Sequence, residues 1–209
     1  MRRLVPILLV ILLSYQGYSQ TTEYTYSCGD KKSTITWIEN RLDSIIYLKT
    51  IQGSETHKYV MSRDFNTLSW EYSDTSENID IKAVLENGIY KIEGTFKSKA
   101  YSETYDSKGY PWYQNIGFNV GYSIERTSSF KFECIRPDNL KLYEMQADAK
   151  EISDANGNRQ QRINISLTGM LSKFFGSDYY IDLSTRKFIL YKGRHGAPGT
   201  PITTITIKK

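Results

Sequence analysis

Histidine and cysteine are scarce in this sequence of 209 residues, which has two of each. A catalytic serine or cysteine needs a nearby base, usually histidine, yet neither His57 nor His195 lies near a G-x-S-x-G motif. C-x-x-C, H-x-H and H-E-x-x-H motifs are also missing. The sequence therefore argues against a histidine-dependent hydrolase and a zinc protein, and we predict no metal ion, no cofactor and no catalytic residue.

Glycine motifs that bind phosphate are missing too. The stretch KGRHGAPGTP around His195 matches neither G-x-G-x-x-G nor G-x-x-x-x-G-K-[ST]. Its glycines and prolines predict an irregular loop that exposes His195. This loop should follow a hairpin made by Tyr179–Leu183 and Phe188–Tyr191. The stretch SDANGNRQ lacks the closing carboxylate of a calcium loop and predicts a hairpin turn.

No strong excess of one charge is present. The formal net charge is +4, and it falls to +2 when Arg2 and Arg3 are left out. Proteins that bind nucleic acids concentrate lysine and arginine on one face. We therefore predict no nucleic-acid partner.

The sequence has a single apolar run, Leu4–Leu13, and its ten residues are fewer than the roughly 20 that span a bilayer. Two arginines precede this run, and the small residues Gly17 and Ser19 follow it. This is the pattern of a secretory signal peptide. We predict that residues 1–19 are cleaved. Residues 20–209 would form one exported, soluble β-rich domain, in the periplasm or outside the cell, and not an integral membrane protein.

The two cysteines, Cys28 and Cys134, have two alternative states. An oxidising compartment would allow one disulfide between them, which would close a long loop. They could equally be two buried free thiols. The sequence does not choose between these states.

Alternation of apolar and polar residues is abundant. Phe130, Phe132 and Cys134 should face a core, while Lys131 and Glu133 should face solvent. Similar segments recur at 35–38, 45–51, 59–61, 68–72, 79–85, 90–96, 143–149, 163–167, 179–183, 188–191 and 202–207. Ten to twelve strands at this spacing predict an antiparallel sheet with one buried and one wet face. The dipeptide Asn87-Gly88 predicts a two-residue hairpin turn.

The segment 112–126 fits two structures. Trp112, Ile116, Val120 and Ile124 recur every four residues, as in a helix whose first turn contains Pro111, yet the same segment also alternates like a strand. Its two glycines weaken a helix but would let it lie very close to a sheet. Periodicity alone leaves both alternatives open.

Paired aromatic residues suggest a ligand site. Trp112 and Tyr113, with Phe175 and Tyr180 from two further aromatic pairs, could line a hydrophobic or sugar-binding concavity. Arg136 follows an apolar strand face and could bind an anion at the rim. The alternative interpretation is core aromatics and a solvated arginine.

Four stretches carry a resemblance to a known family: PWYQNIGF, FECIRPDNLKLYEMQADAK, RINISLTGMLSKFFGSDYYIDL and FILYKGRHGAPGTPIT. Over residues 80–207 the chain resembles an uncharacterised family of exported bacterial proteins with a periplasmic β half-barrel. That architecture is similar to the architecture of lipoprotein-carrier (LolA-like) proteins. The resemblance implies a mainly β fold, with a curved antiparallel sheet (half-barrel or open barrel) packed around one short helix after Pro111. It implies no activity.

Three functions remain as hypotheses. The leading one is a non-enzymatic exported domain that binds a lipid-like or other hydrophobic ligand on its concave face. The second is a hydrolase of envelope or polysaccharide material that uses a pair of Asp or Glu residues. The third is a surface interaction module whose core is filled by its own helix.

Overall fold

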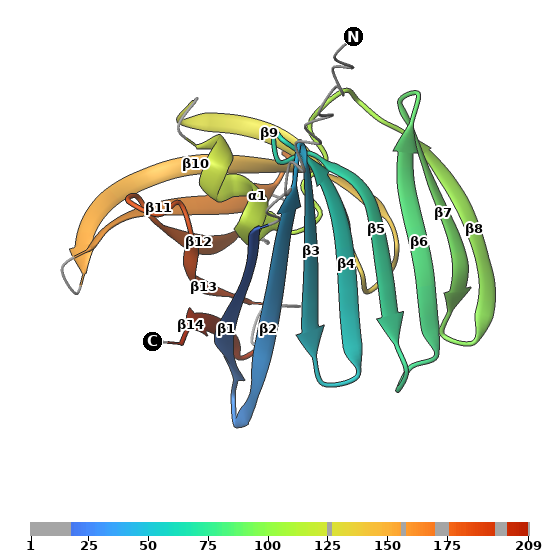
Figure 1. Ribbon diagram of the computed structural model, residues 1–209, viewed down its shortest axis with the longest axis horizontal. Helices are drawn as coiled ribbons and strands as arrows, with labels where there is room; N and C mark the ends of the chain where they lie inside the picture. The colour runs from blue at the N-terminus through green and yellow to red at the C-terminus, as the bar shows by residue number, and fades with distance from the viewer. Residues whose placement is uncertain (1–17, 125–126, 156–157, 170–175, 195–199, 209) are drawn as a thin grey trace, which may run out of the picture.

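The computed structural model describes residues 18–124, 127–155, 158–169, 176–194 and 200–208. Within these ranges the chain forms one antiparallel sheet of fourteen strands and one α-helix, so the predicted fold class is confirmed (Figure 1). The first eight strands are β1 Tyr18–Cys28, β2 Lys31–Leu42, β3 Ile45–Gln52, β4 Glu55–Ser62, β5 Thr67–Asp74, β6 Ile79–Glu86, β7 Ile89–Phe96 and β8 Lys99–Asp106. After helix α1 (Ile116–Ser123), the others are β9 Ser129–Ile135, β10 Leu142–Ala155, β11 Asn158–Leu167, β12 Gly176–Asp182, β13 Phe188–Arg194 and β14 Ile202–Ile207.

The sheet consists of two meanders. Strands β1–β8 pair in sequence order, β9–β14 do the same, and β1 pairs with β14 to join the two halves. The outermost strands are therefore β8 and β9, and the chain passes from one edge to the other through residues 107–128. Short turns set the register. Asn87 and Gly88 both have positive φ angles, as the predicted hairpin requires.

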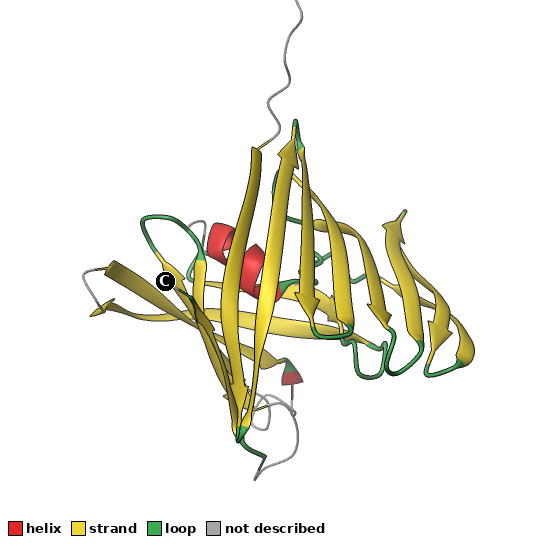
Figure 2. Ribbon diagram, turned by 60° about the horizontal axis from the view of Figure 1, so that its bottom comes forward, coloured by secondary structure: helices red, strands yellow, loops and turns green. Residues whose placement is uncertain are grey.

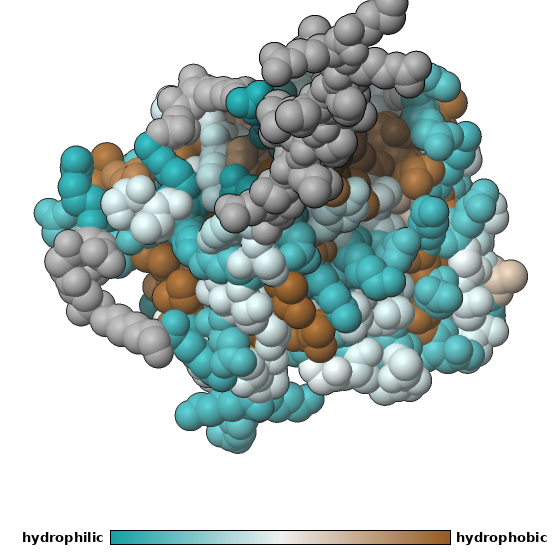
Figure 3. Space-filling view, in the orientation of Figure 1, coloured by the Kyte–Doolittle hydropathy of each residue, from teal (hydrophilic) through white to brown (hydrophobic). Residues whose placement is uncertain are grey.

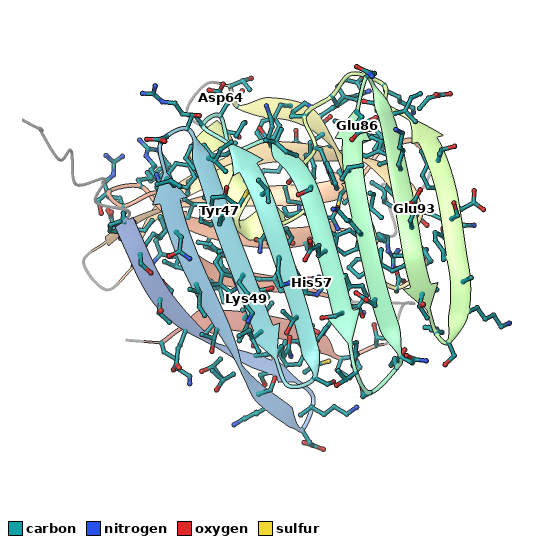
Figure 4. All side chains as sticks on the ribbon, turned by 45° about the vertical axis from the view of Figure 1, so that its right-hand side comes forward. Tyr47, Lys49, His57, Asp64, Glu86 and Glu93 are labelled. Carbon is teal, nitrogen blue, oxygen red and sulfur yellow. The ribbon has the colours of Figure 1, made fainter. Side chains whose placement is uncertain are left out.

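The sheet curls so that one face is concave and α1 lies against it (Figure 2). Apolar side chains of the concave face form two clusters, one centred on β3–β7 and one on β9–β13, and Trp37 packs against both. The convex face is polar, with Tyr47, Lys49 and Glu93 among its side chains (Figure 4). Within the described ranges, no helix is long and apolar enough to cross a membrane.

The segment that begins at Trp112, for which the sequence left helix and strand open, contains a β-bridge followed by a helix. Trp112 forms a bridge with β9, and the helix begins only after Asn115, whose side-chain oxygen accepts a hydrogen bond from the N–H of Phe118 at 3.1 Å. The expectation that Pro111 lies in the first turn of the helix is wrong. The Asn115 cap satisfies a free N–H of the first turn, and the helix starts at Ile116, five residues after Pro111.

Both helix glycines lie close to the sheet, as expected if they let the helix approach it. A Cβ atom on Gly121 would lie 2.5 Å from the carbonyl oxygen of Arg186, and one on Gly117 would lie 3.2 Å from the ring of Phe188. Any other residue at Gly121 would push α1 away from the β12–β13 hairpin. That hairpin has the pairing expected from the sequence, with Tyr179 opposite Tyr191.

Candidate functional site

Edge strands β8 and β9 do not pair with each other, and residues 107–114, which we call the strap, lead from the end of β8 to the edge of β9. The strap forms a parallel bridge with β9 between Trp112 and Glu133. On its other side, the N–H of Thr67 at the start of β5 donates to the carbonyl of Trp112 at 2.8 Å. The strap therefore ties the two halves of the sheet together at one end.

A buried carboxylate holds the first residues of the strap. Glu133 is 1% exposed and accepts three hydrogen bonds. The donors are the hydroxyl of Tyr90 at 2.9 Å, the hydroxyl of Ser107 at 2.6 Å and the N–H of Lys108 at 2.7 Å. Burial, together with the bond to this carboxylate, raises the pKa of Tyr90. The expectation that Glu133 faces solvent is wrong because the strap covers it.

A second carboxylate, Glu144, joins the strap to β9 from the outside. Lys108 lies 2.8 Å and Lys131 2.7 Å from its two oxygens. These hydrogen bonds lower the pKa of Glu144 from 4.5 to about 2. The ammonium group of Lys131 also lies 5.5 Å from the centre of the Tyr110 ring.

A hollow of about 780 Å³ opens beside the strap. Its walls come from the strap, the β4–β5 turn, β6, the end of α1 and β9, and its apolar lining includes Phe65, Leu68, Leu85, Tyr110, Tyr122 and Phe130. Asp64 in the β4–β5 turn and Glu86 at the end of β6 mark this end of the sheet (Figure 4). In the space-filling view, hydrophobic side chains gather in a recess in the upper part of the molecule (Figure 3).

Two of the five residues predicted for a ligand site lie at this hollow. Trp112 and Tyr113 close its inner side and are 1% and 5% exposed. The indole N–H of Trp112 donates to the side chain of Gln114 at 2.8 Å, and the Tyr113 hydroxyl lies 2.5 Å from that of Ser123. Both aromatic residues therefore have fixed positions.

The other three residues are not brought to the hollow. The guanidinium of Arg136 bonds to Asp138 in the β9–β10 turn and packs near the ring of Tyr143. Tyr180 is half-buried on β12 and belongs to neither apolar cluster, whereas its neighbour Tyr179 packs inside. Phe175 lies outside the described residues. A ligand role for the five residues stays a prediction.

Several wall residues were not predicted from the sequence. Phe65, in a turn and with a positive φ angle of 62°, stacks on Tyr122 of α1 at a ring distance of 3.8 Å. Leu68 is the second residue of β5 and is 42% exposed, although leucine is usually buried in a strand. In the sequence, Phe65 and Leu68 are marked only by their positions close to the ends of strands. These positions indicate a shared site only once the strands are placed side by side.

His57 has a structural environment. Its ring stacks on that of Tyr72 at 4.5 Å, its Nδ1 accepts a hydrogen bond from the indole N–H of Trp70 at 3.1 Å, and its Nε2 lies 3.2 Å from Glu55. Both ring nitrogens therefore have partners. The second histidine, His195, lies outside the described residues.

Of the two states left open for the cysteines, the structure has the free thiols. Cys28 is half-buried and Cys134 is buried. Burial raises the pKa of Cys134 to about 12, so its reactive thiolate form is strongly disfavoured.

The hollow offers little for acid–base or metal chemistry. Asp64 is the one carboxylate among its described lining residues, so it does not provide the carboxylate pair that the hydrolase hypothesis needs. Across the described parts of the chain, no group of three His, Cys, Asp or Glu residues is placed to hold a metal ion.

Comparison with known proteins shows the fold alone. No family model matches the sequence, and no curated protein matches it. Among solved structures, the chain is similar to a β-barrel-like protein of domain of unknown function DUF1849 from Brucella abortus. The TM-score is 0.61 at 8% sequence identity, over 91% of this chain and 96% of that chain. The similarity supports a barrel-like fold and carries no activity.

Proposed function

We propose that this protein is an exported, non-enzymatic binding protein that holds one hydrophobic or lipid-like molecule in the hollow beside the strap. The observation that carries the proposal is the hollow itself. Its volume of about 780 Å³ lies within the range of roughly 300–1,000 Å³ that is typical of small-molecule sites. The predicted signal peptide supports export.

The lining favours an apolar molecule. The stacked rings of Phe65 and Tyr122 form a flat wall, and Leu68 and Leu85 lie on the β5–β6 side. An apolar ligand would remove exposed surface of Leu68 from water, which stabilises a complex by about 25 cal/mol per Å². The polar end of a bound amphiphile would lie close to the charged side chains of Lys131 and Asp64, which also line the hollow.

The location differs from the one expected for a half-barrel carrier. Most of the concave face is filled by α1 and by the two apolar clusters, so it is not an open cup. This packing favours the interaction-module hypothesis as a second candidate, in which an apolar side chain of a partner protein would occupy the same hollow.

A fluorescent fatty-acid probe tests the proposal. We expect the purified protein to bind the probe at a ratio of 1:1. We expect Leu68→Lys to weaken binding at least tenfold, because it places an ammonium group at the apolar wall. Leu42→Lys is the control, since Leu42 has a similar exposure of 46% but does not line the hollow.

Two results would contradict the proposal. One is the absence of probe binding to folded wild-type protein. The other is equal weakening by both leucine substitutions, which would show that the probe binds elsewhere.

A further inference from the structure

The two edges of the sheet differ in how they are covered. The edge of β9 is partly covered by the strap, through the bridge between Trp112 and Glu133. The edge of β8 has no backbone hydrogen-bond partner among the residues that the structure describes. β8 is eight residues long, pairs with β7 without a bulge, and contains no proline. An edge of this kind is a template for another strand.

The turn before β8 determines which backbone groups point outward. Lys97 and Ser98 form a two-residue turn and both have positive φ angles, so Phe96 and Lys99 form the hydrogen-bonded pair that closes the hairpin. Every second residue from Lys99 then bonds to β7. The N–H and C=O groups of Ala100, Ser102 and Thr104 therefore point to the open edge.

One face of β8 carries a positive and a negative side chain, separated by a tyrosine. Lys99, Tyr101, Glu103 and Tyr105 share the concave face, and the small residues Ala100, Ser102 and Thr104 share the other. Lys99 and Glu103 are exposed, and neither has an ion-pair partner within the described ranges. Two unpaired opposite charges lie four residues apart on an open edge.

This spacing is self-complementary in one antiparallel register. When two copies of β8 are centred on Tyr101, Lys99 of each copy lies opposite the partner's Glu103, and Ala100 lies opposite the partner's Ser102. A register centred on Ser102 places Lys99 opposite tyrosine, and one centred on Glu103 places two glutamates opposite each other. Charge therefore selects the Tyr101-centred register.

We propose that β8 is a self-association edge, at which two copies of this chain join their sheets through antiparallel β8–β8 pairing centred on Tyr101. Four backbone hydrogen bonds connect Ala100 and Ser102 of the two copies, and two cross-strand ion pairs flank them. The interface is small, so monomer and dimer are in equilibrium and the dimer is not permanent. This pairing does not depend on whether the hollow binds a ligand.

Sedimentation velocity across a concentration series tests the pairing. The wild-type protein is expected to shift from monomer towards twice the monomer mass as its concentration rises to hundreds of micromolar. Ser102→Pro should abolish this shift: the N–H it removes faces the open edge, where proline is tolerated within a folded sheet. Ser102→Ala keeps the N–H and should dimerise like the wild type.

Charge reversal tests the register. Glu103→Lys alone places two lysines opposite each other and should weaken dimerisation at least fivefold. The double variant Lys99→Glu with Glu103→Lys restores opposite charges and should recover the wild-type equilibrium. Circular dichroism confirms that each variant is folded. A wild-type monomer at every concentration, a folded Ser102→Pro variant that still dimerises, or a double variant no better than Glu103→Lys would each overturn the proposal.

Discussion

Among single residues, Glu144 organises the charges outside the strap. Its carboxylate is shared by Lys108 and Lys131, and its pKa falls from 4.5 to about 2 as a result. A carboxyl with a lowered pKa in the folded state stabilises the fold above its unfolded pKa, and this stabilisation is lost as the pH falls towards the folded pKa. The cluster therefore stabilises the fold at neutral pH, and this contribution is lost between about pH 4.5 and 2.

We predict that Glu144→Gln lowers the free energy of unfolding by at most about 1 kcal/mol at pH 7, because the lysines are at the surface. The difference from the wild type should shrink as the pH falls below 4.5. Urea unfolding of both proteins at pH 7, 4 and 3 measures it. A difference that stays constant over this range would show that the carboxylate charge is not involved.

The candidate site shows which residues sequence reasoning could find. Trp112 and Tyr113 were found because adjacent aromatic residues at a strand boundary are visible in the sequence. The apolar neighbours of Arg136 suggest an anion site, but its guanidinium donates to Asp138, two residues away. Leu68 was missed because its role depends on strands that are distant in sequence.

Among the elements, helix α1 depends on its close contact with the β12–β13 hairpin. Alanine normally stabilises a helix relative to glycine by about 1 kcal/mol. At Gly121 the added Cβ would lie 2.5 Å from a backbone oxygen, and this contact outweighs the gain in helix propensity.

We predict that Gly121→Ala lowers the free energy of unfolding by about 1–3 kcal/mol, as overpacking does. Gly176→Ala is the control, because its Cβ would meet its nearest neighbour at 3.8 Å, an ordinary contact. Thermal unfolding of both variants measures the effect. A Gly121→Ala protein as stable as the control would mean that the helix can move away from the sheet at no cost.

Strand prediction succeeded where one face is apolar. The two strands that the sequence did not reveal are β1 and β8, whose residues are mostly Thr, Ser, Tyr and charged. Their concave faces carry tyrosines and polar side chains, so the apolar–polar contrast is weak. Both become strands because a neighbouring strand supplies the hydrogen bonds, through β2 and β14 for β1 and through β7 for β8.

For the whole molecule, Glu133 connects the two ends of the open sheet. This carboxylate, with its partners Tyr90 and Ser107, joins β7, the strap and β9, which are separated by up to 43 positions in the sequence. Alternation alone placed Glu133 in solvent, because no local pattern indicates that a distant segment will cover a strand.

We predict that Glu133→Ala lowers the free energy of unfolding by about 3 kcal/mol, since three donors, of which the Tyr90 hydroxyl is buried, lose a charged acceptor. Glu93→Ala is the control, because Glu93 is exposed on the convex face of β7 and should change stability by less than about 0.5 kcal/mol. Urea unfolding compares the two. Equal effects would show that the strap does not need this carboxylate.

Native mass spectrometry of the protein purified from an exporting host tests the binding function most directly. We expect the wild type to carry one hydrophobic molecule per chain, extractable into organic solvent, and the Leu68→Lys variant to have lost it while Leu42→Lys retains it. A folded wild-type protein that carries no such molecule, and takes none up from added lipid, would contradict the proposal.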